Sequence, residues 1–164
     1  MLHEATISSL TIDPNNQTPL LLLKLKDEEI TVPIMIGLLE AGSIAAVLQE
    51  IVFDRPMTHD LFTNFINKVD VKIDKIEIID ILNNTFYAKL YFSDKDGQHW
   101  IDSRPSDAIA MAIRAGARIY IEDEVIQKLK TEKDFEAMDN SEEGSKWADY
   151  LSNLTDDDFG KYKV

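Results

Sequence analysis

The amino-acid sequence predicts an α+β fold, with a mixed or antiparallel sheet of about six to seven strands and three main helices packed on it. Segments in which apolar and polar residues alternate, as they do in strands, occupy much of residues 1–130. Between them lie segments whose apolar residues recur at helical spacing. Hydrophobic residues make up 45% of the 164-residue chain, which is enough to bury the core of one domain.

The first part of the chain predicts three strands and a helix. Residues 4–12 alternate in part and end at the turn-forming segment DPNNQTP. Residues 20–25 and 30–36 flank the polar segment KDEE, which indicates a hairpin. Apolar residues then recur at helical spacing over residues 38–51, and the small residues among them allow this helix to pack closely against a neighbour.

The rest of this region predicts three helices interleaved with strands. Thr58 is expected to cap a helix that runs to Val69. Pro105 opens another helix, which Gly116 ends, and a short helix covers residues 122–130. The strands expected here are separated from one another by turns or by a helix, and they cover residues 71–82, 85–92, 98–102 and 118–121.

The chain divides near residue 130. Residues 1–130 form the folded domain, whereas residues 131–164 carry ten acidic and four basic side chains and predict an acidic, weakly helical or flexible tail. The few spaced aromatic residues of this tail, such as Trp147 and Tyr150, indicate weak docking on the domain. We therefore expect the fold to survive without the tail.

Composition excludes several classes of protein. There are no cysteines, so disulfides, thiolate metal sites and cysteine nucleophiles are excluded. No apolar stretch approaches the roughly 18–20 residues of a membrane span, and residues 1–20 lack the features of a signal peptide, so we expect a cytoplasmic protein without membrane contact. The net charge of −13 disfavours nucleic acid as a partner, because a surface that neutralises phosphates should be basic.

Two short segments that begin with or contain Arg-Pro concentrate the polar residues suited to chemistry: RPMTHD at 55–60 and DSRPSD at 102–107. Each precedes an apolar helix that must pack on the same sheet, so we expect the two segments to lie close together. Asp107 could simply stabilise the dipole of its helix. His59, beside Asp60, is suited to proton transfer or to binding a metal.

These residue types are consistent with two different sites. Carboxylates that hold Mg²⁺ or Mn²⁺, an imidazole that moves a proton and arginines that stabilise phosphoryl charge would suit metal-assisted phosphodiester hydrolysis. The same groups would also suit a salt-bridged pocket that holds subunits together. The common phosphate-loop, dinucleotide, nucleophile-elbow, zinc-protease and EF-hand motifs are absent, and no serine has an evident histidine and acid at known spacing.

Four segments, read together, resemble the bifunctional nuclease domain family. They are VPIMIGLLEAGSIAAVLQ (32–49), RPMTHDLF (55–62), TFYAKLYF (85–92) and IDSRPSDAIAMAIR (101–114). The resemblance covers about residues 1–130, and the acidic tail lies outside it. It implies an oligomeric α+β domain with the DNase and RNase activity of some plant members. The matching polar positions are Glu40, Arg55, Thr58, His59, Asp60, Asp102, Arg104, Ser106, Asp107 and Arg114.

The roles assigned to these positions follow from the resemblance together with side-chain chemistry. The expected catalytic residues are His59, Asp60, Asp102, Arg104 and Asp107. The expected substrate-binding residues are Arg55, Ser106 and Arg114. The carboxylates expected to hold a divalent metal, Mg²⁺ or Mn²⁺, are Asp102, Asp107 and Glu40.

Two functions therefore compete. The first is a nuclease or phosphodiesterase that hydrolyses DNA, RNA or both. The alternative is a non-catalytic oligomeric module that binds a ligand or protein and whose Arg/Asp clusters are structural. Convergence of Asp60, Asp102 and Asp107 in an open pocket would favour the enzyme, and burial of these acids against arginines would favour the module. In either case we expect a homo-oligomer, most simply a dimer.

Overall fold

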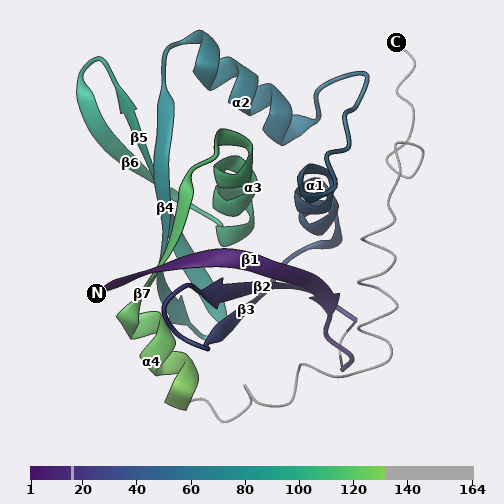
Figure 1. The fold of residues 1–164 in the computed structure, drawn as a ribbon, viewed down its shortest axis with the longest axis vertical. Helices are drawn as coiled ribbons and strands as arrows, with labels where there is room; N and C mark the ends of the chain where they lie inside the picture. Colours follow the sequence, from purple (N-terminus) through teal and green to yellow (C-terminus); the bar gives the residue numbers. More distant parts are fainter. Residues whose placement is uncertain (16, 132–164) are drawn as a thin grey trace.

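A seven-stranded mixed sheet forms the framework of residues 1–15 and 17–131, the part of the chain that the computed structural model describes (Figure 1). The order of its strands is β3-β2-β1-β7-β4-β5-β6. The strands are β1 (Leu2–Ile12), β2 (Pro19–Leu25), β3 (Thr31–Met35), β4 (Lys72–Leu82), β5 (Thr85–Asp94), β6 (Gly97–Ser103) and β7 (Arg118–Glu122). The helices are α1 (Leu38–Leu48), α2 (Thr58–Lys68), α3 (Pro105–Ala115) and α4 (Asp123–Thr131).

Strand β7 joins two antiparallel three-stranded units into one sheet. On one side it pairs antiparallel with β1, where Ile119 lies opposite Ala5. On the other side it pairs parallel with β4, where Ile119 lies opposite Ile76. All three side chains are buried, so this junction belongs to the core. A parallel pair requires a crossover connection, and α3 supplies it between β6 and β7.

Helix α3 is the element on which the other helices converge. It contacts α1 and α2 as well as strands β4, β5 and β7 (Figure 1). Its buried residues are mostly small, and Ala108, Ala110 and Ala112 are each fully buried. Small side chains at a helix contact allow the two axes to approach closely. The close packing expected of the small-residue helices therefore brings polar residues of α1, α2 and α3 within hydrogen-bonding reach.

The helices and strands agree with the predicted fold class, and the differences are of one to three residues at the ends of helices and strands. Helix α1 ends at Leu48 rather than Ile51, because Glu50 adopts a left-handed backbone conformation with φ of 57°. Thr58 is the first helical residue rather than the cap. Met57 occupies the cap position, and the Asp60 carboxylate accepts a hydrogen bond from its backbone N–H at 3.0 Å.

Two further expectations concern the boundaries of the chain and its relation to membranes. The acidic tail of residues 132–164 lies outside the described residues. Within the described part of the chain, every helix is too short or too polar to cross a membrane.

Candidate functional site

Polar side chains from α1, α2 and α3 meet in one hydrogen-bonded cluster. Its central contact joins His59 of α2 to Asp107 of α3, with 3.1 Å between Nε2 and Oδ1. These residues belong to the two different Arg-Pro segments, so the prediction that the segments lie close together is confirmed at this pair.

The imidazole of His59 is held at both nitrogens. Besides the contact with Asp107, its Nδ1 lies 2.9 Å from the Oγ of Ser43 on α1. Only 17% of the His59 side chain is exposed, and Ser43 is partly buried. Ser43, His59 and Asp107 therefore form a continuous hydroxyl–imidazole–carboxylate chain.

Arg104 extends this chain to the surface. As the cap residue of α3 it donates to Asp107 through Nε, at 2.7 Å from Oδ2, and through Nη2, at 3.1 Å from Oδ1. Its Nη1 lies 3.1 Å from Oε1 of Glu40. The Arg104 side chain is 66% exposed, so its guanidinium is both held by two carboxylates and open to solvent.

These contacts keep Asp107 ionised. Partial burial acts to raise the pKa of the Asp107 carboxyl, but the hydrogen bonds from Arg104 and His59 outweigh burial and lower that pKa. Conversely, the hydrogen bond and charge of Asp107 raise the pKa of Arg104. The site therefore presents a fixed ion pair beside an imidazole.

Glu40 can reach Arg104 because residue 37 is a glycine. Gly37 caps α1, and the Glu40 carboxylate folds back over it. A β-carbon at position 37 would overlap that carboxylate. The missing side chain at position 37 therefore sets the position of the Glu40 carboxylate.

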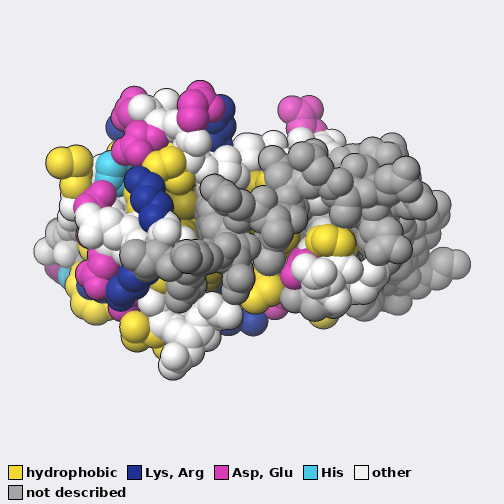
Figure 2. Space-filling model, turned by 90° about the horizontal axis from the view of Figure 1, so that it is seen from below, with side chains coloured by type: hydrophobic (Ala, Val, Ile, Leu, Met, Phe, Trp, Pro, Cys, Tyr) yellow, Lys and Arg dark blue, Asp and Glu magenta, His cyan; other side chains and the backbone are white. Residues whose placement is uncertain are grey.

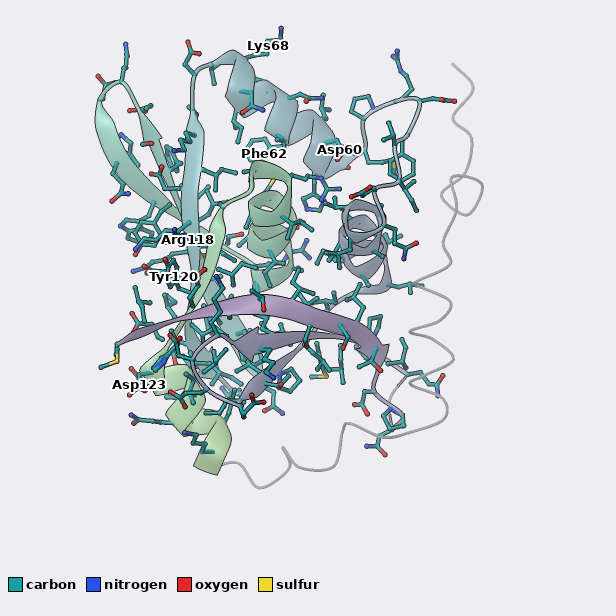
Figure 3. The ribbon with its side chains drawn as sticks, in the orientation of Figure 1. Asp60, Phe62, Lys68, Arg118, Tyr120 and Asp123 are labelled. Atoms are coloured by element: carbon teal, nitrogen blue, oxygen red, sulfur yellow. The ribbon has the colours of Figure 1, made fainter. Side chains whose placement is uncertain are left out.

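Arg114 is the buried member of the cluster, with 6% of its side chain exposed. Its Nε donates to Asp60 Oδ1 at 2.6 Å, and its Nη1 donates to the Ala110 carbonyl at 3.0 Å. Its Nη2 donates to both oxygens of Ser43, at 3.2 Å for the carbonyl and 3.1 Å for Oγ. Asp60 lies at the end of α2 that faces α1 and α3 (Figure 3), so this guanidinium ties the three helices together.

Other predicted site residues lie outside this cluster. Asp102 is exposed on strand β6, opposite Lys89 of β5, and Arg55 is exposed between α1 and α2. Ser106 is buried in the first turn of α3. In the described part of the chain, these three side chains make none of the contacts that connect His59, Asp107 and Arg104.

The predicted metal ligands do not form a ready site. Glu40 and Asp107 are oxygen donors of the kind that Mg²⁺ and Mn²⁺ prefer, but both contact Arg104. Asp102 lies apart from them on β6. Residues 1–15 and 17–131 contain no group of three or more histidine or acidic side chains placed to hold a metal ion. The side chains as positioned do not fit a metal.

Ser43 is the residue that sequence reasoning missed. It precedes His59 by 16 positions, and His59 precedes Asp107 by 48, so no local motif joins the three. The small residues near it in the sequence, Ala41, Gly42 and Ala45, indicate only close helix packing. Only the packing of α1 against α2 and α3 reveals that its hydroxyl faces an imidazole.

Comparison with known proteins gives a consistent result. The family model of the bifunctional nuclease domain matches residues 21–134. Two proteins of Mycobacterium tuberculosis, from strains CDC 1551 and H37Rv, are each 32% identical to this chain over 164 residues. The similarity covers 96% of this chain and 98% of each relative, and both relatives are described as uncharacterized.

Proposed function

The chain belongs to the bifunctional nuclease domain family, and from this premise we propose that it hydrolyses phosphodiester bonds of DNA, RNA or both. The observation that carries the proposal is the exposed guanidinium of Arg104 beside the His59–Asp107 pair. A phosphate needs a cation to bind it, and its hydrolysis needs a group that moves a proton. Asp107 contacts both Arg104 and His59, so the cluster places a cation and a proton-transfer group beside the same carboxylate.

Arg104 is the proposed phosphate-binding residue. A guanidinium presents several N–H donors in a plane that matches the oxygens of a phosphate. Asp107 and Glu40 fix its position before a substrate arrives, so little ordering is needed on binding. His59 is the proposed proton-transfer residue, since imidazole takes up and releases protons near neutral pH.

The two carboxylates beside Arg104 weaken its binding of a phosphate. Two carboxylates share one guanidinium, and a phosphate must therefore compete with Glu40 or Asp107. A divalent cation would relieve this repulsion, and a requirement for Mg²⁺ or Mn²⁺ stays a prediction. Because the side chains as positioned do not form a metal site, no step is assigned to a metal.

Charge also bears on the length of the substrate. The chain has a net charge of −13, and on the face shown in Figure 2 acidic and basic side chains are intermixed. A long polyanion gains affinity from each phosphate that a basic surface neutralises. We therefore propose short oligonucleotides as substrates rather than long duplexes.

The alternative, a non-catalytic oligomeric module, is favoured by two observations. Asp102 lies on β6 and does not converge with Asp60 and Asp107. Asp60 pairs with the buried Arg114, as expected if these groups are structural. The Asp107 pair differs in its arginine, because the Arg104 side chain is 66% exposed whereas that of Arg114 is 6% exposed. The two arginines thus have different environments, and we assign a structural role to Asp60 and phosphate chemistry to Arg104 and Asp107.

The test is cleavage of labelled single-stranded DNA and RNA by purified protein, with Mg²⁺, with Mn²⁺ and with a chelator. His59→Ala should lose roughly 10²–10⁴-fold in rate if His59 is the acid or base. The matched control is His99→Ala, which removes an exposed histidine on β6 that pairs with Asp94 and should leave the rate unchanged. Full activity in both variants would place the cleavage elsewhere, and a wild type inactive under every condition would favour the module.

A further inference from the structure

We infer that Ser43 is the nucleophile of this reaction, with His59 as its base and Asp107 as the group that orients His59. The inference rests on the proposed function and deepens it, because it replaces direct attack by water with a covalent intermediate on the protein. The chain of contacts from Ser43 Oγ through His59 to Asp107 carries it.

Counting hydrogen-bond donors assigns the protons in this chain. The ionised Asp107 carboxylate only accepts, so His59 Nε2 carries the hydrogen and donates it to Asp107. A neutral imidazole carries one N–H, so Nδ1 is then an acceptor and the Ser43 hydroxyl donates to it. Ser43 Oγ in turn accepts the hydrogen bond from Arg114 Nη2. This is the tautomer in which His59 can withdraw the serine proton.

The same contacts exclude the simplest role for His59. A base that activates water needs an acceptor nitrogen that water can reach. Here Nε2 donates to Asp107, and the acceptor Nδ1 is already occupied by Ser43. In this arrangement the serine hydroxyl is the group from which His59 removes a proton.

Arg114 supplies the electrostatic support that a serine nucleophile needs. Its Nη2 lies 3.1 Å from Oγ, so the negative charge that develops when the proton leaves is stabilised by a neighbouring cation. The guanidinium is buried and anchored by Asp60 and the Ala110 carbonyl, so it needs no rearrangement during the reaction. Arg114 is thus a positioning and stabilising residue rather than a surface charge.

The arrangement resembles the Ser-His-Asp triad of serine hydrolases, except that the two imidazole nitrogens exchange partners. In serine proteases the serine faces Nε2 and the aspartate faces Nδ1. Here Nδ1 faces the serine and Nε2 faces the aspartate. Both nitrogens of imidazole can accept a proton, so the roles of the three groups are retained.

The reaction balances in two steps. In the first, Ser43 Oγ forms a bond to phosphorus, its proton moves to His59 Nδ1, and the ester P–O bond breaks as the leaving oxygen takes that proton. In the second, water attacks phosphorus and gives a proton to His59, and the bond to Oγ breaks as Oγ regains a proton. The sum is one phosphodiester and one water converted to a monoester and an alcohol.

A fluorophosphonate probe tests the nucleophile without relying on nuclease activity. The probe loses fluoride to an activated serine and leaves a phosphonyl group that intact-protein and peptide mass spectrometry can locate. We expect one group per chain, on Ser43, in the wild type. Ser43→Ala should abolish labelling, and His59→Gln should slow it by at least tenfold because the base is removed. Ser8→Ala is the matched control, since Ser8 is an exposed strand serine whose hydroxyl donates to the Leu22 carbonyl, and this variant should label fully.

The outcomes separate this inference from the proposed function. No labelling of the wild type, or equal labelling of Ser43→Ala, would overturn the role of Ser43. Alanine suits both the helix and its small-residue surroundings, and thermal melting checks that the variant is folded. Cleavage of oligonucleotides that persists in Ser43→Ala would refute the nucleophile and leave the nuclease proposal standing. Labelling on Ser43 without any cleavage would refute the nuclease and retain Ser43 as a nucleophile toward another ester.

Discussion

The pair Asp60–Arg114 makes an asymmetric prediction about stability. Replacing Asp60 with Ala should destabilise the fold more than replacing Arg114 with Met, although both changes break the same 2.6 Å contact. The reason is what each change leaves behind. Asp60→Ala leaves the Arg114 side chain, 6% exposed, without its carboxylate partner. Arg114→Met leaves the Asp60 side chain, 30% exposed, without its cation.

The magnitudes follow from these environments. Removing one partner of a buried ion pair costs about 3–5 kcal/mol, and the partial exposure of Asp60 points to the lower end, about 3 kcal/mol. Arg114→Met loses the charge-assisted hydrogen bond to Asp60 together with the hydrogen bonds to Ser43 and the Ala110 carbonyl. We expect a cost of about 2 kcal/mol, because Ser43 Oγ keeps its contact with His59 and the freed Asp60 carboxylate keeps its bond to Met57. For a chain of this size these costs correspond to losses of about 6–12 °C and 4–8 °C in Tm.

Thermal unfolding followed by circular dichroism measures both variants and the double variant. Asp60→Ala combined with Arg114→Met leaves no unpaired buried cation, so it should be more stable than Asp60→Ala alone. A larger loss for Arg114→Met than for Asp60→Ala, or a double variant equal to the sum of the singles, would refute the reasoning.

The remaining predictions concern the site, acid stability and assembly. Gly37→Ala should displace the Glu40 carboxylate and break its contact with Arg104. We expect the rate of cleavage to fall to that of Glu40→Gln, and the free energy of unfolding, from thermal melts, to change by only about 0–1 kcal/mol. The pKa of Asp107 is lowered in the folded state, so its ionised form stabilises the fold above the ordinary pKa of an aspartate, and this stabilisation is lost as pH falls through the lowered value. The Tm of Asp107→Asn should therefore fall less than the Tm of the wild type when melts are recorded at decreasing pH. Truncation after Lys130 should leave a cooperative melt, and a large fall in Tm would show that the tail belongs to the core. The exposed apolar side chains of α2 (Leu61, Phe62 and Phe65) and of Val69, which follows it, lead us to propose a homo-oligomer, and sedimentation at the mass of a monomer at micromolar concentration would contradict it.

Local signals explain why most elements could be predicted from the sequence. Helix α3 begins at Pro105 and ends before Gly116, whose φ is 66°, so both ends of this helix could be predicted from the sequence. The alternation in β4 and β5 and the Asn83–Asn84 turn between them were equally local, and both asparagines adopt positive φ. Helix ends, alternating strands and turns of this kind are determined by a few residues that are adjacent in the sequence.

The pairing of β7 could not be predicted in the same way. This strand has five residues, and its two partners, β1 and β4, are distant in sequence. Its position depends on where α3 packs, which is a property of the whole core. Sequence patterns therefore predicted the strand but not its central place in the sheet.

The candidate site shows the same division. The contact between His59 and Asp107 was expected because each lies in the first turn of a helix, but of these two helices only α3 packs on the sheet, and α2 packs mainly on α3. Asp102 was grouped with them because it is near Arg104 in the sequence, yet it belongs to an exposed strand. Ser43 carries no sequence signal, because its role arises from helix packing alone.

The location at which a phosphodiester binds decides whether the cluster around His59, Asp107 and Arg104 is the active site. A short phosphorothioate oligonucleotide, which resists cleavage, can be titrated into isotope-labelled protein while NMR follows the imidazole of His59 and the guanidinium of Arg104. We expect saturable shifts at these two groups, lost in Arg104→Gln, with little change at His99 on β6. Shifts confined to other surfaces, or binding unaffected by Arg104→Gln, would contradict the assignment of this cluster as the phosphodiester site.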